Sequence, residues 1–166
     1  MIPVLILLSG PPGVGKTTVA SVLQVILEQS AWLDGDDVWR IQPFTVTPET
    51  IALAEKNIID VLHNYVAAES PFVIFTWVMH RQDIVNRIVR GLEGLDFTLA
   101  HFALVSDENS LKTRLKERAN GPINMELPLM RLEQCRLLPA IQIDTSSLTA
   151  EQVADIIERR LDFIEE

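Results

Sequence analysis

Residues 10–17 read Gly10-Pro11-Pro12-Gly13-Val14-Gly15-Lys16-Thr17. This stretch matches the phosphate-binding pattern G-x-x-x-x-G-K-[ST] at every fixed position. The apolar run 3–9 before it is typical of a buried strand, and an amphipathic helical pattern begins at Lys16. The motif therefore lies between a strand and a helix, which is the setting in which it binds phosphate.

The chemistry of this loop follows from its residue types. Glycines let successive backbone N–H groups point at phosphate oxygens, and the start of the helix adds its positive dipole end. Lys16, which is expected to face solvent without a ligand, would reach the β- and γ-phosphates, and the Thr17 hydroxyl would ligate Mg²⁺. The alternative is an ordinary glycine-rich turn with a surface lysine. The predicted nucleotide-binding residues of the loop are Gly10, Pro11, Pro12, Gly13, Val14, Gly15, Lys16, Thr17 and Thr18.

Composition favours one domain over residues 1–166, because 166 residues with 48% hydrophobic content can bury a sizeable core. The apolar N-terminal run is too short for a signal peptide or a membrane span, and the single Cys135 excludes an intrachain disulfide. We therefore expect a cytoplasmic location and no membrane partner. A net charge of −9 argues against a long nucleic acid as partner, and the sequence does not indicate an oligomeric state.

Apolar and amphipathic segments alternate along the chain. Strands are expected at about residues 3–8, 31–33, 72–78, 97–105 and 140–144. Helices are expected at about residues 16–29, 47–68, 81–90, 106–118, 127–137 and 149–163. This order predicts an α/β fold of the three-layer P-loop NTPase type, with a five-stranded parallel sheet, helices on both faces and a short lid at about 119–130.

Three carboxylates follow the second expected strand in the segment Asp34-Gly35-Asp36-Asp37. Phosphoryl transfer to an alcohol needs a carboxylate that accepts the proton of the hydroxyl. Asp34 and Asp36 are two residues apart, so on an extended segment they point the same way. One can hold Mg²⁺ through water while the other faces an acceptor. The alternative is a turn followed by an acidic helix cap.

Other nucleotide-binding classes are disfavoured by what the sequence lacks. It has no Asn-Lys-x-Asp segment for guanine, and the strand expected at 72–78 does not end in the Asp-Glu pair of hydrolytic ATPases. The chain is also short for an AAA-type motor with its lid domain. The residues that are present fit a phosphotransferase.

Four segments resemble the small P-loop kinases, namely the gluconate, shikimate, adenylylsulfate and nucleoside monophosphate kinases and the chloramphenicol phosphotransferases. They are the phosphate-binding loop at 7–18, the acidic segment at 32–37, the Leu-Arg pattern at 111–118 and the Ile-Asp-Thr-Ser segment at 143–146. The resemblance spans nearly the whole chain. It implies a kinase that uses ATP and Mg²⁺ to move the γ-phosphoryl group to a hydroxyl of a small molecule such as a sugar acid, an antibiotic or a nucleoside.

The resemblance also implies roles for individual residues. Asp36 would be the base, and Asp34 would support Mg²⁺ together with Thr17. Arg118 would stabilise charge on the transferring group, and Arg114 would lie on the nucleotide side. The alternative for both arginines is a charge pair with Glu117 or contact with solvent. The implied catalytic residues are Lys16, Asp36 and Arg118.

The acceptor is less well indicated. Asp36, Arg40, Thr76 and Arg81 are candidate contacts, although Arg40 can equally pair with Asp37. The basic residues of 112–136 suggest a local anion site, whereas a solvated helix face explains most of them equally well. Roles are left open for Trp77, which either stacks on an acceptor ring or packs in the fold, and for His80, Arg131 and Arg136.

Departures from the family patterns keep the acceptor open. No Gly-Gly-Gly follows the third strand, as it would in a shikimate kinase, and 119–130 lacks the gluconate-kinase lid pattern. A nucleoside or nucleotide kinase is the main alternative within the class. An alternative of another class is a non-catalytic ATP-binding module or slow ATPase switch. A polynucleotide 5′-kinase is disfavoured by the charge of −9.

Overall fold

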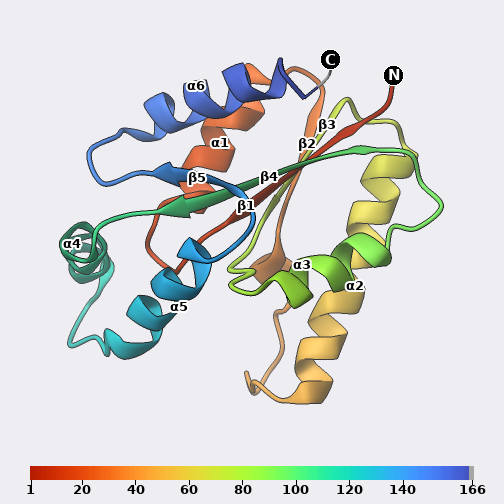
Figure 1. Ribbon diagram of the computed structural model, residues 1–166. Helices are drawn as coiled ribbons and strands as arrows, with labels where there is room; N and C mark the ends of the chain where they lie inside the picture. The colour runs from red at the N-terminus through yellow and green to blue at the C-terminus, as the bar shows by residue number, and fades with distance from the viewer. Residues whose placement is uncertain (165–166) are drawn as a thin grey trace.

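The computed structural model describes residues 1–164. Over these residues, five parallel strands form one sheet in the order β2-β3-β1-β4-β5 (Figure 1). The strands are β1 (Val4–Ser9), β2 (Ser30–Asp34), β3 (Phe72–Thr76), β4 (Thr98–Val105) and β5 (Ile141–Asp144). Their carboxyl ends meet at one edge of the sheet, where ligands of open α/β sheets bind.

β1 lies at the centre of the sheet and is buried along its whole length. Alternate side chains of a strand point to opposite faces, and β1 shows this in its packing. Val4, Ile6 and Leu8 belong to the core on one face, whereas Leu5 and Leu7 belong to the core on the other. The continuous apolar run is therefore explained by burial on both faces.

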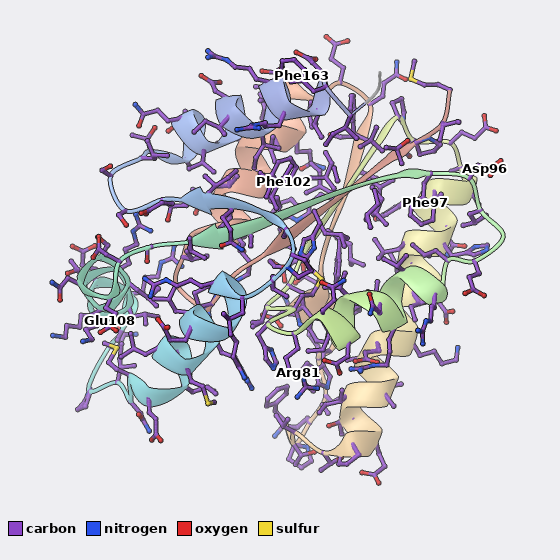
Figure 2. All side chains as sticks on the ribbon, viewed as in Figure 1. Arg81, Asp96, Phe97, Phe102, Glu108 and Phe163 are labelled. Atoms are coloured by element: carbon purple, nitrogen blue, oxygen red, sulfur yellow. The ribbon has the colours of Figure 1, made fainter. Side chains whose placement is uncertain are left out.

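Helices cover both faces of the sheet. Figure 1 shows α1 and α6 together on one face, and α2 and α3 on the other. α5 packs against β4, and Figure 2 shows Phe102 of β4 in the interior beside α1. The helices are α1 (Lys16–Ile26), α2 (Pro48–Ala67), α3 (Gln82–Arg90), α4 (Glu108–Arg118), α5 (Glu126–Arg136) and α6 (Ala150–Leu161), with a 3-10 turn η1 (Gly35–Val38) after β2.

The predicted fold class is confirmed, and the element boundaries differ by a few residues. α1 ends at Ile26 instead of Gln29, because Leu27 is already extended and Gln29 has a positive φ of 59°. β3 ends at Thr76 instead of Val78, although backbone hydrogen bonds from Trp77 N–H to the Leu8 carbonyl at 3.4 Å and from Gly10 N–H to the Val78 carbonyl at 3.2 Å continue beyond the strand. Within residues 1–164, no helix is both long enough and apolar enough to span a bilayer.

Candidate nucleotide and acceptor site

The phosphate-binding loop connects β1 to α1, and a glycine begins the helix. Gly15 has a φ of 105°, a left-handed conformation that few other residues tolerate. The Lys16 ammonium donates to the carbonyls of Gly10 at 2.8 Å and Pro11 at 3.0 Å. The expectation that Lys16 faces solvent is therefore wrong: its side chain is partly buried along the loop. Burial lowers the pKa of the ammonium to about 8.

Asp34, the last residue of β2, connects the acidic segment to the loop. Its Oδ2 accepts hydrogen bonds from the hydroxyls of Thr17 at 3.1 Å and Thr76 at 3.0 Å. Its Oδ1 accepts from the backbone N–H of Asp36 at 3.0 Å and thereby caps η1. The indole of Trp32 donates to the Thr76 hydroxyl at 3.2 Å. The structure thus brings together Thr17 and Asp34, the two residues predicted to hold Mg²⁺.

Asp36 follows Asp34 by two residues, within η1, and its side chain is exposed. The indole N–H of Trp77 donates to its Oδ1 at 3.2 Å. The same indole covers Gly35, where an added Cβ would lie only 2.6 Å from Cδ1 of Trp77. Trp77 therefore packs in the fold, one of the two readings left open above, and it does so while bonded to the predicted base.

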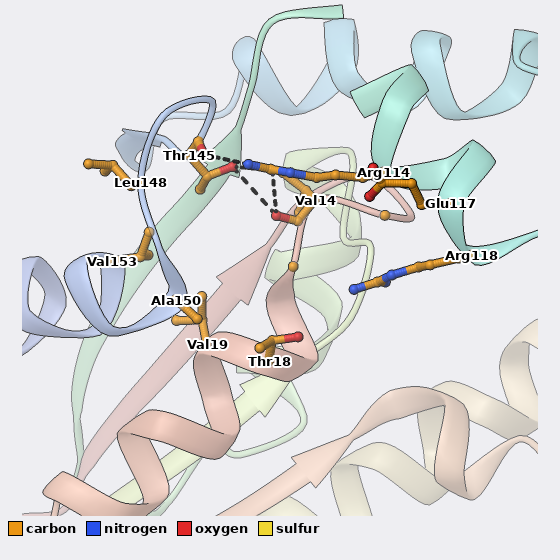
Figure 3. A pocket seen from close by; sticks show the side chains of 12 residues that line it. Val14, Thr18, Val19, Arg114, Glu117, Arg118, Thr145, Leu148, Ala150 and Val153 are labelled. Carbon is orange, nitrogen blue, oxygen red and sulfur yellow. Dashed lines mark hydrogen bonds between the residues drawn. The ribbon is translucent and has the colours of Figure 1, made fainter. Parts of the chain in front are cut away.

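A second group of predicted residues lines a pocket of about 250 Å³ between the loop, α4 and the segment after β5. Figure 3 shows the Arg114 side chain crossing to Thr145 and Val14. Its guanidinium donates to Thr145 Oγ1 at 2.9 Å, to the Thr145 carbonyl at 2.6 Å and to the Val14 carbonyl at 3.3 Å. Arg114 thereby ties the β5 end to the phosphate-binding loop, and it makes no pair with Glu117 among the described residues.

Arg118, from the last turn of α4, lines the same pocket, as do Gly13, Gly15 and Thr18. Figure 3 shows its guanidinium extended into the pocket on the side of Thr18. Within residues 1–164 it makes no hydrogen bond or ion pair. Arg118 is therefore placed where a cation can meet an anionic ligand.

The candidate acceptor contacts have partners of their own. Arg40 pairs with Asp37 at 2.6 Å, one of the two readings left open above. Arg81, seen at the start of α3 in Figure 2, donates to both carboxylate oxygens of Asp83 at 2.9 and 3.0 Å. Thr76 is fully buried beneath Asp34. These contacts place Thr76 as a support for Asp34.

The residues whose roles were left open have polar contacts or a shifted pKa. Arg136 pairs with Glu133 and donates to the Ser106 carbonyl at 2.6 Å, and Arg131 donates to Gln134 at 2.9 Å. Burial, helped by the charges of Arg131 and Arg81, lowers the pKa of His80 to about 4, so the imidazole is neutral at pH 7.

Sequence reasoning missed two contributors to the site. Trp32 holds the Thr76 hydroxyl, and Thr145 accepts two of the Arg114 bonds. Thr145 stands in the Ile-Asp-Thr-Ser segment that was singled out, so a signal for it was present. Trp32 is the first residue of the acidic segment 32–37, but its bond to Thr76 has no local signal, because the partner lies 44 positions away in the chain.

The donor set of this site fits a magnesium ion. Mg²⁺ prefers hard oxygen ligands and is bound by one or two protein groups together with phosphate oxygens. The Thr17 hydroxyl and the Asp34 carboxylate supply such oxygens 3.1 Å apart, beside the lysine of the loop. A second carboxylate, Asp36, stands two residues after Asp34 in η1.

Solved structures with this fold carry the names of kinases and of a resistance protein. The tunicamycin resistance protein of Deinococcus radiodurans is 23% identical, with a TM-score of 0.78 over 97% of this chain and 96% of that one. A gluconokinase from Sinorhizobium meliloti 1021 is 16% identical, with a TM-score of 0.72 over 99% and 95%. Thymidylate kinase from Candida albicans is 16% identical, with a TM-score of 0.68 over 99% and 93%. At these identities the likeness shows the fold, and the resemblance to small P-loop kinases is confirmed at that level.

No curated protein sequence matches the chain. A family model described as AAA domain matches residues 6–138, from within β1 to just beyond α5. That description names a domain and not a reaction. The match covers most of the chain and includes both the phosphate-binding loop and the acidic segment, and the chain therefore belongs to the AAA domain family, with the fold of the small P-loop kinases.

Proposed function

We propose that this protein is a kinase that uses ATP and Mg²⁺ to phosphorylate a hydroxyl group of a small molecule. One observation carries the proposal: Thr17 of the phosphate-binding loop bonds to Asp34, and Asp36 follows Asp34 at the carboxyl edge of the sheet. A nucleotide-binding module that only switches has no need for a second, exposed carboxylate at that place. A phosphotransferase needs one to take the proton of its acceptor.

Each residue then has a chemical role. Lys16 exchanges its two carbonyl partners for phosphate oxygens, and Arg118 meets the transferring group from the opposite side. Thr17 and Asp34 would hold Mg²⁺, which when bound neutralises charge on the β- and γ-phosphates. Arg114 keeps the β5 end against the loop, beside the nucleotide.

The transfer itself is a displacement at phosphorus. The oxygen of the acceptor hydroxyl bonds to the γ-phosphorus, and the bond from that phosphorus to the bridging oxygen breaks, which releases ADP. The hydroxyl proton passes to Asp36. Residues 119–130 would act as a lid that excludes water, within a single domain over 1–166.

The experiment is a search for the phosphorylated product. The protein is incubated with Mg·ATP and a panel of sugar acids, hydroxylated antibiotics, nucleosides and nucleoside monophosphates, and ADP and phosphomonoester are measured in parallel. We expect equal amounts of both with at least one acceptor. Slow ADP release that no acceptor stimulates, with free phosphate as the product, would instead indicate a nucleotide switch.

A further inference from the structure

The surroundings of Asp36 are aromatic. Trp77 bonds to Asp36, Trp39 meets the Trp77 ring edge-on with centroids 6.1 Å apart, and Phe44 meets Trp39 at 5.2 Å. Trp39, Phe44 and Trp77 are called the aromatic cluster here. A hydroxyl that gives its proton to Asp36 must approach within about 2.6–3.2 Å. The skeleton that carries this hydroxyl therefore comes within reach of the Trp77 ring.

Two properties of the aromatic cluster point to a ligand. Phe44 is 59% exposed, so an apolar ring faces solvent at the end of the aromatic cluster, next to Trp39. The indole N–H of Trp39 is buried and has no hydrogen-bond partner among the described residues. Buried donors without partners are rare because they cost free energy. A bound molecule with a ring and an oxygen would cover the exposed face of Phe44 and would accept a hydrogen bond from the Trp39 N–H.

The charges around Asp36 disfavour an anionic acceptor. The two arginines that were candidates for binding an anion are paired, Arg40 with Asp37 and Arg81 with Asp83. Asp34 and Asp36 add two carboxylates at the same edge of the sheet. A carboxylate or phosphate on the acceptor would have to break an ion pair or approach these negative charges.

We infer that the acceptor is an uncharged alcohol with a planar ring near its reacting hydroxyl. This inference rests on the proposed phosphotransfer and names the substrate class of the same site. The ring packs on Trp39 and Phe44, which orients the hydroxyl toward Asp36 and makes these two side chains specificity-determining residues.

The test compares four classes of alcohol at a fixed concentration of Mg·ATP. Uridine, thymidine and 1-phenyl-1,2-ethanediol are neutral and carry a ring. Uridine and thymidine 5′-monophosphates carry the same rings with a negative charge. Ribose and glycerol are neutral without an aromatic ring, and gluconate is anionic without one. We expect a kcat/KM at least tenfold higher for one of the first three compounds than for any of the others.

Two exposed phenylalanines provide matched variants. Phe44→Ala removes the exposed ring that packs on Trp39, and Phe163→Ala removes a ring that is 76% exposed after α6, at the opposite end of the molecule from Arg81 in Figure 2. Phe44→Ala should raise the KM of the ring-bearing acceptor about tenfold and leave the KM of ATP unchanged. Phe163→Ala should change neither constant.

The outcomes separate this inference from the proposed function. Turnover of gluconate or of a nucleoside monophosphate alone, lost in Asp36→Asn, would overturn the inference and leave the phosphotransfer intact. Equal turnover of alcohols with and without a ring, or an unchanged KM in Phe44→Ala, would also overturn it. If Mg·ATP binds but no class gives Asp36-dependent turnover, both the inference and the proposed function fail.

Discussion

The nucleotide side and the acceptor side of the site are built in different ways. On the nucleotide side, Lys16 and Arg114 bond mainly to backbone carbonyls of Gly10, Pro11, Val14 and Thr145. On the acceptor side, side chains bond to side chains: Thr76 to Asp34 and Trp77 to Asp36. A backbone carbonyl remains an acceptor when its residue is substituted, whereas a side-chain partner is lost with the residue that carries it. The nucleotide side is therefore suited to a shared ligand and the acceptor side to one that differs between relatives.

Lys16→Ala should have the largest effect on the nucleotide side. The variant removes the only lysine of the loop, and we expect kcat/KM for ATP to fall by about a hundredfold or more, as for other preorganised charge contacts. Steady-state kinetics measures the loss. Lys112→Ala is the control, because Lys112 pairs with Glu108 on the surface of α4. Turnover at the wild-type rate in Lys16→Ala would contradict the assigned role.

Gly35→Ala should have the largest structural effect on the acceptor side. The added Cβ would lie 2.6 Å from the Trp77 ring, so the indole must move and its bond to Asp36 must lengthen. Overpacking of this kind costs about 1–3 kcal/mol. Thermal unfolding measures the loss, and acceptor turnover should fall while ATP binding persists.

Gly121→Ala is the matched control for this substitution, since nothing lies within 4 Å of an added Cβ there. Equal melting temperatures for the two variants would show that the packing of Trp77 on Gly35 contributes nothing to stability. The packing of Trp77 would then no longer support the view that contacts between side chains hold the acceptor side together.

Nucleotide affinity should also depend on pH, and this effect is smaller than that of Lys16→Ala. Burial lowers the pKa of Lys16 to about 8, and bound phosphates favour its charged form. Nucleotide affinity should therefore be constant below pH 8 and fall by about tenfold per pH unit above it, until the pKa of the complex is reached. Titration calorimetry between pH 6.5 and 9.5 measures this profile. Lys16→Arg should flatten it, and a flat wild-type profile would contradict the assignment.

The phosphate-binding loop of the nucleotide side could be predicted because its parts are contiguous in the sequence. Residues 10–17 carry the glycine pattern, and the apolar run before them is explained by burial of β1 on both faces. The link between Thr17 and Asp34 could be expected as well, because Asp34 ends β2 and Thr17 stands at the end of the loop after β1, at the same edge of a parallel sheet.

The acceptor side could be predicted only in outline. That Trp77 packs on Gly35 and bonds to Asp36 depends on a contact between residues 41 positions apart. The same holds for Thr76, which looked like an acceptor contact at the end of a strand and lies buried under Asp34. Local patterns place such residues at the right edge of the sheet, but they do not say which neighbour each side chain bonds to.

Asp36→Asn, measured beside Asp37→Asn, tests whether Asp36 takes the proton of the acceptor hydroxyl. Asparagine keeps the size of the side chain and can still accept the Trp77 hydrogen bond, but it is a far weaker base than the carboxylate. Acceptor-dependent ADP release should fall by about a hundredfold or more in Asp36→Asn with unchanged ATP binding, whereas Asp37→Asn should stay within about threefold of wild type. Equal activity of the two variants would show that Asp36 is not the base of the phosphotransfer.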